Sequence, residues 1–396
     1  MYTLVNPVKD YPWGSLEAIP RLLGVAPTGG PQAELWIGAH PAGPSRAITA
    51  TGEQSLRDVI SADPKAALGD RVAGRFGPEL PFLLKVLSAV KPLSLQVHPS
   101  KEQAKKGYAD EEAAGIPLDA PTRNFKDRNH KPELLFALTP FEALSGFKPV
   151  AESAALLRLL QLRAGPGGVL DDLLGDLGSG AGNAGLRAAA ERLLTLDEAT
   201  VESTVASVVV ACGGLDDPAA DIAVELNRVF PNDPGVVLAL LLNRITLAPG
   251  DAIYLPAGNL HAYLRGTGIE LMAASDNVLR GGLTDKHIDV AQLLAIVDFT
   301  SGPPMRVQPI EAAGRRDFGV PVDDFALSIL DVDKGREVRW DDDLPRTAIV
   351  LEGSLELAGR AGAVQLGPGG SVFVAAADSP VVITGVGRLA VASPGT

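Results

Sequence analysis

Apolar residues along the first part of the chain fall into short runs rather than long stretches. Between residues 1 and about 150, segments such as 81–87 (PFLLKVL) and 93–97 (LSLQV) alternate with stretches rich in proline and glycine. Short apolar runs bounded by turn-forming residues are typical of β-strands. We therefore expect this part of the chain to be mainly β.

The pattern changes over residues 151–228, where apolar residues recur at helical spacing. AESAALLRLLQLRA and LRAAAERLLTL are rich in strong helix formers, and a glycine-rich stretch at 175–185 lies between them. This pattern predicts a helical insertion. The next apolar run, VVLALLLNRI at 236–245, is consistent with a strand or with a buried helix, because periodicity does not distinguish the two in so short a run.

Strand-like runs return after the helical part, and one of them carries an informative spacing. Residues 248–266, APGDAIYLPAGNLHAYLRG, contain Gly250, Pro256, Gly258 and His261 in the order Gly-x5-Pro-x-Gly-x2-His. A glycine turn begins a strand, Pro-x-Gly ends it at a tight corner, and the histidine opens the next strand, facing the interior of a barrel. The spacing resembles the second signature of cupins, which are double-sheet jelly rolls. Arg265 occupies the position where cupins usually have asparagine.

The C-terminal part repeats this arrangement without the histidine. Residues 366–380, LGPGGSVFVAAADSP, align with 247–261 so that Gly369 matches Gly250 and Pro380 stands where His261 does. We infer a second jelly roll that lacks a metal ligand, with an unrelated β-hairpin as the alternative.

The expected fold is mainly β with a helical insertion, consisting of two cupin-like jelly rolls plus an α-helical domain, and SGPPM at 301–305 is the expected linker. The expected domains are the first part of a catalytic cupin domain (1–150), a helical insertion domain (151–228), the remainder of the catalytic cupin domain (229–300) and a C-terminal metal-free jelly roll (301–396).

Composition and charge narrow the possible functions. The net charge of -13 argues against nucleic acid as a partner, because phosphate backbones are bound by clustered lysine and arginine. No apolar run approaches the roughly 20 residues that span a bilayer, and the first residues do not form a signal peptide. The single cysteine, Cys212, cannot form an intramolecular disulfide, and we interpret it as a buried apolar residue. These features favour a cytoplasmic protein.

Four residues form a candidate metal site. Gln96 and His98 are two residues apart in SLQVHPSK, so their side chains share one face of a strand. His98 and His261 are two of only five histidines, and both are expected to face a barrel interior. Glu133 begins the apolar run ELLFAL, where a buried carboxylate is costly unless it is paired or bound to metal. The alternative is an exposed turn residue. Together the four are a mixed nitrogen and oxygen set suited to a divalent ion such as zinc.

Several segments resemble one enzyme family. QVHPSK, HKPELLFAL, DYPWGS, ELWIGAHPAGPS and LPAGNLHAYLRGTGIELMAASDNVLRGGLTDKHIDV are similar to the type I mannose-6-phosphate isomerases, also called phosphomannose isomerases. The similarity runs from about residue 2 to residue 300 and is weak beyond. It implies a zinc-dependent interconversion of mannose 6-phosphate and fructose 6-phosphate in the carbohydrate metabolism that leads to GDP-mannose. We expect a monomer that acts on this small sugar phosphate with one zinc ion per chain.

The resemblance also implies roles for individual residues. The zinc ligands would be Gln96, His98, Glu133 and His261, and Arg280 would be the basic residue beside the reacting sugar. Ser94, Lys101 and Lys286 match further positions that would line the pocket, although Asp285 weakens a phosphate-binding role for Lys286.

The implied reaction moves a proton between C1 and C2 of the open-chain sugar through an enediol. Lys131 and Glu270 are both candidates for the base, and the sequence leaves the choice open. For Lys131 to act as a neutral base its pKa must be depressed, and the alternative role for Lys131 is an ion pair.

Other residues are assigned to packing. Trp13 and Trp36 are expected to pack the first jelly roll, His40 and His130 to be structural or to support the ligands, and His287 to be a surface or packing residue.

Two other functions remain as alternatives. An iron-dependent oxygenase usually has two histidines and one carboxylate without glutamine, and a non-catalytic sugar-binding cupin would not need the four ligands.

Overall fold

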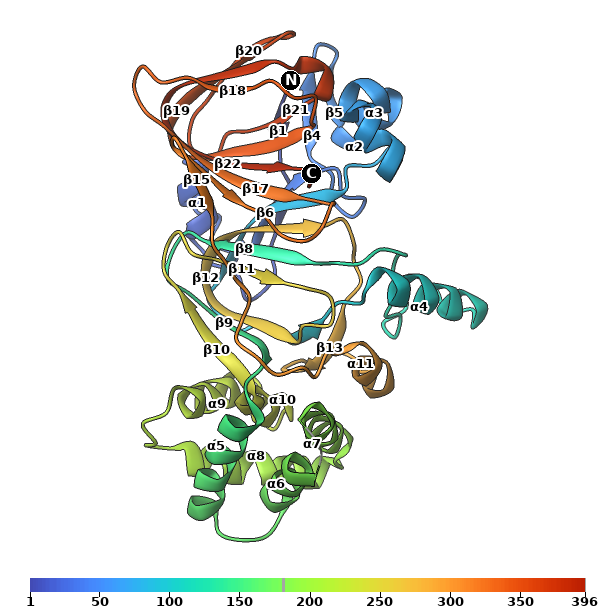
Figure 1. The fold of residues 1–396 in the computed structure, drawn as a ribbon, viewed down its shortest axis with the longest axis vertical. Coiled ribbons are helices and arrows are strands. Elements are labelled where there is room, and N and C mark those ends of the chain that lie inside the picture. Colours follow the sequence, from blue (N-terminus) through green and yellow to red (C-terminus); the bar gives the residue numbers. More distant parts are fainter. Residues whose placement is uncertain (180–181, 396) are drawn as a thin grey trace.

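The protein is described by a computed structural model over residues 1–179 and 182–395. An upper β region, a middle β region and a lower helical region follow one another along its long axis (Figure 1). Over these described residues the fold is mainly β, with two sheets of 11 strands each and 11 α-helices. The predicted mainly β fold is confirmed. None of the described helices is long and apolar enough to cross a membrane.

The middle sheet contains the segments of the candidate site. Its strands are β2 (Val8–Lys9), β3 (Glu34–Gly38), β6 (Phe82–Ala89), β7 (Leu95–Val97), β8 (Glu133–Ala137), β9 (Phe141–Phe147), β10 (Leu242–Leu247), β11 (Ala252–Leu255), β12 (His261–Ala273), β13 (Leu279–Gly282) and β14 (Arg306–Val307). The long strand β12 pairs with β7 and β9 near its start and with β6 and β8 along its second half. Strands from distant parts of the sequence therefore meet along β12.

The upper sheet combines the C-terminal strands with strands from the other end of the chain. Its strands are β1 (Tyr2–Val5), β4 (Arg46–Thr49), β5 (Gly52–Ser55), β15 (Ile310–Ala312), β16 (Arg315–Phe318), β17 (Ala326–Val332), β18 (Val338–Trp340), β19 (Arg346–Gly359), β20 (Gly362–Leu366), β21 (Ser371–Val374) and β22 (Val381–Ser393). Tyr2 of β1 lies opposite Phe373 of β21, and β4 pairs with β1. The predicted domain boundaries assign these N-terminal strands to the catalytic cupin domain at 1–150, because a strand pattern in the sequence does not identify the strand with which it pairs.

The internal similarity noted in the sequence falls on matching elements. β11 and β21 each follow a glycine with positive φ, Gly250 at 98° and Gly369 at 75°. Such a backbone conformation is unfavourable for residues with a Cβ atom. β11 and β21 each precede a strand of 13 residues, β12 and β22. The first of these begins at His261, whereas the second begins after Pro380.

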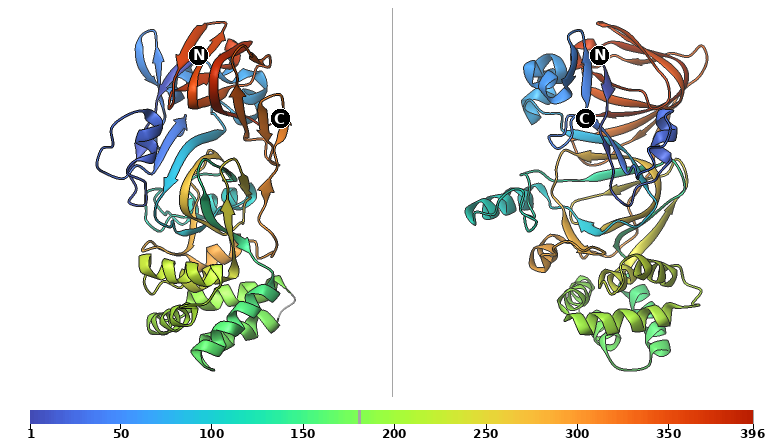
Figure 2. Two further views of the ribbon diagram at one scale, coloured as in Figure 1. Left: turned by 90° about the vertical axis from the view of Figure 1, so that its left-hand side faces the viewer. Right: turned by 180° about the vertical axis from the view of Figure 1, so that it is seen from behind.

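The helical region lies at the end of the molecule opposite the upper sheet (Figure 2). It consists of α5 (Val150–Ala164), α6 (Val169–Ser179), α7 (Asn183–Thr195), α8 (Glu198–Cys212), α9 (Pro218–Val229), α10 (Gly235–Leu238) and the 3-10 helix η1 (Ala239–Leu241). The ambiguous run 236–245 is therefore helical in its first half and becomes strand β10 from Leu242. The remaining helices are α1 (Ala18–Leu23), α2 (Leu56–Ala62), α3 (Pro64–Phe76), α4 (Lys101–Ala113), α11 (Val290–Ile296) and the 3-10 helix η2 (Ala376–Asp378).

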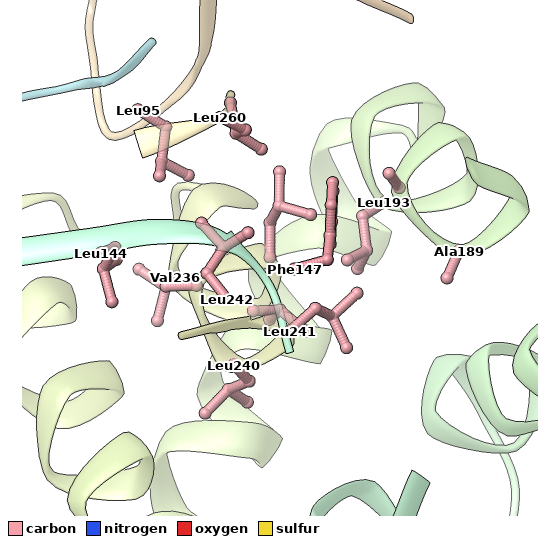
Figure 3. Close-up of a cluster of buried hydrophobic side chains, with 14 of the residues drawn as sticks. Leu95, Leu144, Phe147, Ala189, Leu193, Val236, Leu240, Leu241, Leu242 and Leu260 are labelled. Atoms are coloured by element: carbon pink, nitrogen blue, oxygen red, sulfur yellow. The ribbon is translucent and has the colours of Figure 1, made fainter. Parts of the chain in front are cut away.

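Buried apolar side chains join these regions. Leu95, Leu144 and Leu260 from the middle β region belong to one cluster with residues of the helical region such as Leu193 and Val236 (Figure 3). A second cluster contains residues of both sheets, and within it the rings of Phe136 and Phe318 lie 5.3 Å apart. Removing this apolar surface from water stabilises the contacts between the regions and so positions the walls of the candidate site.

Candidate metal centre and active site

Three buried side chains converge within the middle sheet. Glu133 begins β8, His261 begins β12 and His98 follows β7, and each is 1% exposed. Nε2 of His98 lies 3.2 Å from Oε1 of Glu133, and Nε2 of His261 lies 3.3 Å from Oε2 of Glu133. Over the described residues, this is the one group of three or more His, Cys, Asp or Glu side chains placed to hold a metal ion.

Hydrogen bonds orient the rings of the two histidines in a way that suits metal ligands. Nδ1 of His98 lies 2.7 Å from the carbonyl oxygen of Asn277, and Nδ1 of His261 lies 2.9 Å from that of Asn259. A carbonyl accepts a hydrogen bond from Nδ1–H, which leaves the lone pair on Nε2.

Three buried atoms of the cluster need a further partner. Nε2 of His98, Nε2 of His261 and Oε2 of Glu133 have no hydrogen-bond partner. Buried polar atoms are costly to leave unpaired, so this donor set fits a cation such as zinc.

Electrostatics favours the protonation states that a metal requires. Burial, with help from the nearby Lys131, lowers the pKa of His98 to about 4, so its ring is neutral near neutral pH. Burial alone would raise the pKa of Glu133, but Lys131 and His98 hold it well below its ordinary value. Nζ of Lys131 lies 3.2 Å from Oε1 of Glu133, which is the ion pair considered as one alternative for Lys131. The Glu133 carboxylate is therefore ionised near neutral pH.

Gln96 is placed beside this cluster by strand register. It lies directly opposite His261 on β12 and opposite Arg280 on β13. Side chains of directly opposed residues project from the same face of a sheet, so these three lie in a row. The amide oxygen of Gln96 is thus a candidate fourth ligand.

A cavity of about 690 Å³ opens onto the cluster. Among its lining residues are the predicted site residues Ser94, Gln96, Lys131, Glu133, Glu270, Arg280 and Lys286. Lys101, the first residue of α4, is not among the lining residues. The volume is within the range of small-ligand sites.

Arg280 is half-buried in this cavity. Burial lowers its pKa, and Asp285 opposes that effect. Its guanidinium forms no hydrogen bond or ion pair with any residue in the described parts of the chain. Its donors are therefore available to an anionic group in the cavity.

Comparisons with known proteins give the same picture over the whole chain. The family model described as phosphomannose isomerase type I, catalytic domain, matches residues 1–150, and that described as mannose-6-phosphate isomerase, cupin domain, matches residues 315–394. The chain is 42% identical over 402 residues to the mannose-6-phosphate isomerase of Escherichia coli, covering 98% of each protein. The chain belongs to the mannose-6-phosphate isomerase family.

Other members of the family extend the comparison. Mannose-6-phosphate isomerase 1 of Arabidopsis thaliana is 31% identical over 413 residues, covering 93% of this chain and 88% of the plant protein. The crystal structure of a zinc-bound mannose 6-phosphate isomerase matches with a TM-score of 0.92 and 40% identity, covering 100% of this chain and 99% of that one. A lysine-to-alanine variant of phosphomannose isomerase from Salmonella typhimurium matches with a TM-score of 0.93 and 39% identity over 100% of both chains. The predicted family resemblance is confirmed, and it extends beyond residue 300.

A buried ion-pair cluster in the cavity wall was not predicted from the sequence. Nζ of Lys85 lies 2.9 Å from Oε2 of Glu270 and 3.5 Å from Oε1 of Glu34. Burial alone would lower the pKa of Lys85, but the two carboxylates raise it above its ordinary value. Burial raises the pKa of Glu270, although Lys85 opposes this. The available signal was a lysine in the middle of the apolar run PFLLKVL.

The tryptophans combine packing with a place in the cavity. Trp36 is buried against Leu83 and Met272, and its Nε1 donates to Oε2 of Glu34 over 2.7 Å. Trp36 also lines the cavity, as does Trp13, which packs against a cluster inside the middle sheet. Both side chains could therefore contact a ligand as well as stabilise the sheet.

The other histidines lie outside the metal cluster. His40 is buried beside Trp36 and Asp276, and His130 lies 2.9 Å from Asp324 in the loop before β17. His287 is exposed. These positions agree with the structural roles expected for His40 and His130 and with the surface position expected for His287.

Hydrogen bonds explain the role of the sequence Ser-Asp-Asn at 275–277, within the long segment that resembles the family. Asp127 accepts hydrogen bonds from the Ser275 hydroxyl at 2.9 Å and from the Asp276 amide at 2.8 Å, and the Asn277 side chain donates to the Asp127 carbonyl at 2.9 Å. This network fixes the Asn277 carbonyl that holds His98. The motif therefore supports His98, a candidate metal ligand, without belonging to the candidate ligand set.

Proposed function

We propose that this protein is a metal-dependent aldose–ketose isomerase that interconverts mannose 6-phosphate and fructose 6-phosphate through an enediol. The observation that carries the proposal is the buried cluster of His98, Glu133 and His261, whose unpaired atoms adjoin a cavity with a free arginine. The relatives that match the whole chain bear the name of this activity.

The ion would be held by His98, Glu133, His261 and the amide oxygen of Gln96. When bound, zinc would supply positive charge that polarises the sugar oxygens at C1 and C2. Arg280 adds a fixed positive charge from the neighbouring strand, where it would stabilise the enediolate or orient the reacting carbons. Both effects make the proton on the carbon next to the sugar carbonyl easier to remove.

A side chain in the cavity must then move the proton between C1 and C2. Glu270 and Lys131 both line the cavity. Lys131 contacts Glu133, a proposed metal ligand, whereas Glu270 contacts Lys85. The raised pKa of Glu270 favours its role as the base, because a more basic carboxylate takes up a carbon-bound proton more readily.

Metal removal with a chelator tests this function directly. We expect the chelated protein to lose turnover of mannose 6-phosphate in a coupled assay while its far-ultraviolet circular dichroism stays unchanged, because the large cores do not depend on the ion. Added zinc should restore activity. The variant His98→Ala should lose zinc and activity, whereas the control His287→Ala, at an exposed histidine, should keep both.

The same measurements separate the alternatives. Full activity in a metal-free preparation would exclude the metal assignment. Oxygen consumption with iron would indicate an oxygenase, and sugar binding without turnover would indicate a binding module. Metal analysis should give one ion per chain, and two tightly bound ions would contradict a metal-free C-terminal region.

We also propose that each sheet is a jelly roll, that the helical region is an inserted domain, and that the protein acts as a cytoplasmic monomer. The matching of β11 with β21 and of β12 with β22 supports the first point. The proposed ligands all come from one chain, which is consistent with a monomer. Ser94 and Lys286 line the cavity and remain the proposed substrate-binding residues, whereas Lys101 has weaker support.

A further inference from the structure

The outer wall of the cavity is built from two separate parts of the chain. Val229 and Phe230, at the end of α9, belong to the helical region, whereas residues 283–286 follow β13 of the middle sheet. All of these residues line the cavity that Gln96 and Glu133, two of the proposed metal ligands, also line. The shape of the wall therefore depends on how the helical region meets the segment after β13.

One carboxylate joins these two parts. Oδ1 of Asp233 accepts hydrogen bonds from the backbone amides of Gly235 at 2.7 Å and Leu283 at 2.8 Å. Its Oδ2 accepts a third, from the amide of Thr284, at 3.0 Å. Asp233 lies in the turn between α9 and α10, so it ties the helical region to the segment that leads to Lys286. Hydrogen bonds to an ionised acceptor are the stronger kind.

The backbone at this junction is tightly constrained. Leu283 has a φ of 55°, in the left-handed region that leucine rarely adopts. Gly282 has a φ of 128°, and a Cβ atom at this position would lie 2.7 Å from Cα of Gly235. Such a conformation persists only where its surroundings hold it in place. The hydrogen bonds from Leu283 and Thr284 to Asp233 are the polar contacts that do so.

We propose that Asp233 is a positioning residue for substrate binding, which rests on the proposed isomerase function. Its carboxylate holds residues 283–286 in the conformation that presents Lys286 to the cavity. Arg280 is held separately, because β13 pairs with β7 at Gln96. Loss of Asp233 therefore weakens binding of the sugar phosphate more than it slows the chemical step.

The variant Asp233→Ala tests this role by the separation of KM from kcat. We expect KM for mannose 6-phosphate to rise about tenfold or more, with kcat reduced by less than about threefold. Asp233→Asn keeps an oxygen acceptor for Gly235 and Leu283 but presents an amide donor to Thr284, so its KM should be intermediate. Asp233→Asn also keeps the test decisive if the alanine variant does not fold.

A matched control weakens a different contact between the same two regions. Glu225 on α9 pairs with Arg265 on β12, with Oε2 and Nη2 2.9 Å apart, and neither residue lines the cavity. If Asp233 acts on the cavity wall, Glu225→Gln should leave KM within about twofold of the unmodified enzyme. An equal rise in KM in this control would show a general effect of loosening the helical region, and would overturn the proposal.

Amide hydrogen exchange gives a readout that does not depend on activity. We expect Asp233→Ala to accelerate exchange at Leu283 and Thr284, and Glu225→Gln to leave it unchanged. If the unmodified protein does not isomerise mannose 6-phosphate, the proposed function fails. The exchange result still tests whether Asp233 holds residues 283 and 284 in place. Unchanged exchange or an unchanged KM in both Asp233 variants would overturn the role given to Asp233.

Discussion

Replacing Arg280 by alanine tests whether its charge acts in the chemical step. The guanidinium is half-buried in the cavity and has no hydrogen-bond or ion-pair partner within the described residues, so its removal breaks no polar contact seen there. β13 should persist in the variant, because its pairing with β7 at Gln96 uses the backbone. The variant should therefore retain its fold and its zinc.

The expected loss follows from the environment of this charge. Two unit charges about 4 Å apart interact by about 4 kcal/mol at the effective dielectric constant near 20 that suits partly buried sites. Removal of a preorganised donor to a developing oxyanion typically costs about 3 to 4 kcal/mol, or ~100- to 1000-fold in rate. We therefore expect Arg280→Ala to lower kcat at least about a hundredfold.

Steady-state kinetics with mannose 6-phosphate distinguish the two possible roles of Arg280. If it stabilises the enediolate, kcat falls, whereas if it only binds the phosphate group, KM rises. Arg280→Lys should recover only part of the activity, because an ammonium group lacks the planar fork of donors. A near-normal kcat with a raised KM would refute a role in the chemistry. Lys131 would then be the better candidate for the catalytic charge.

Two further outcomes concern the base and the cysteine. We expect Glu270→Gln to abolish exchange of the C2 proton of mannose 6-phosphate with solvent, because Glu270 is the candidate base that does not contact a proposed metal ligand. Lys131→Met should retain this exchange. The opposite pattern would identify Lys131 as the base. The thiol of Cys212 is 1% exposed, and burial raises its pKa to about 11, so a thiol reagent should label it at neutral pH only after unfolding. Rapid labelling of the native protein would contradict this burial.

Local patterns in the sequence were sufficient to predict much of the metal cluster. Strand alternation and the cupin-like spacing predicted that His98 and His261 face one interior, and the structure places them within 3.3 Å of the same carboxylate. For Glu133, the sequence does not decide between a buried ligand and an exposed turn residue. Its burial depends on β8 lying against β12, which is a contact between distant segments.

The ion-pair cluster in the cavity wall depended on strand register. Lys85 on β6 lies opposite Glu270 on β12 and opposite Trp36 on β3. A lysine within an apolar run signals a buried charge, but only the order of the strands identifies the carboxylates beside it. The run 236–245 was ambiguous for a similar reason. Its first half packs in the helical region and its second half pairs with β9, so tertiary contacts decide its structure.

The pairing of β1 with β21 has a consequence for synthesis of the protein. Tyr2 and Thr3 of β1 pair with Phe373 and Val372 of β21. At about 5–20 residues per second, a ribosome completes the later strand roughly 20 to 75 seconds after the first. Throughout that interval β1 has no partner in the C-terminal sheet, and unpaired strand edges favour association with other chains. A fragment that begins after residue 300 would likewise expose the edge of β21. We therefore expect the isolated C-terminal region to associate more readily than the whole protein, for the same structural reason.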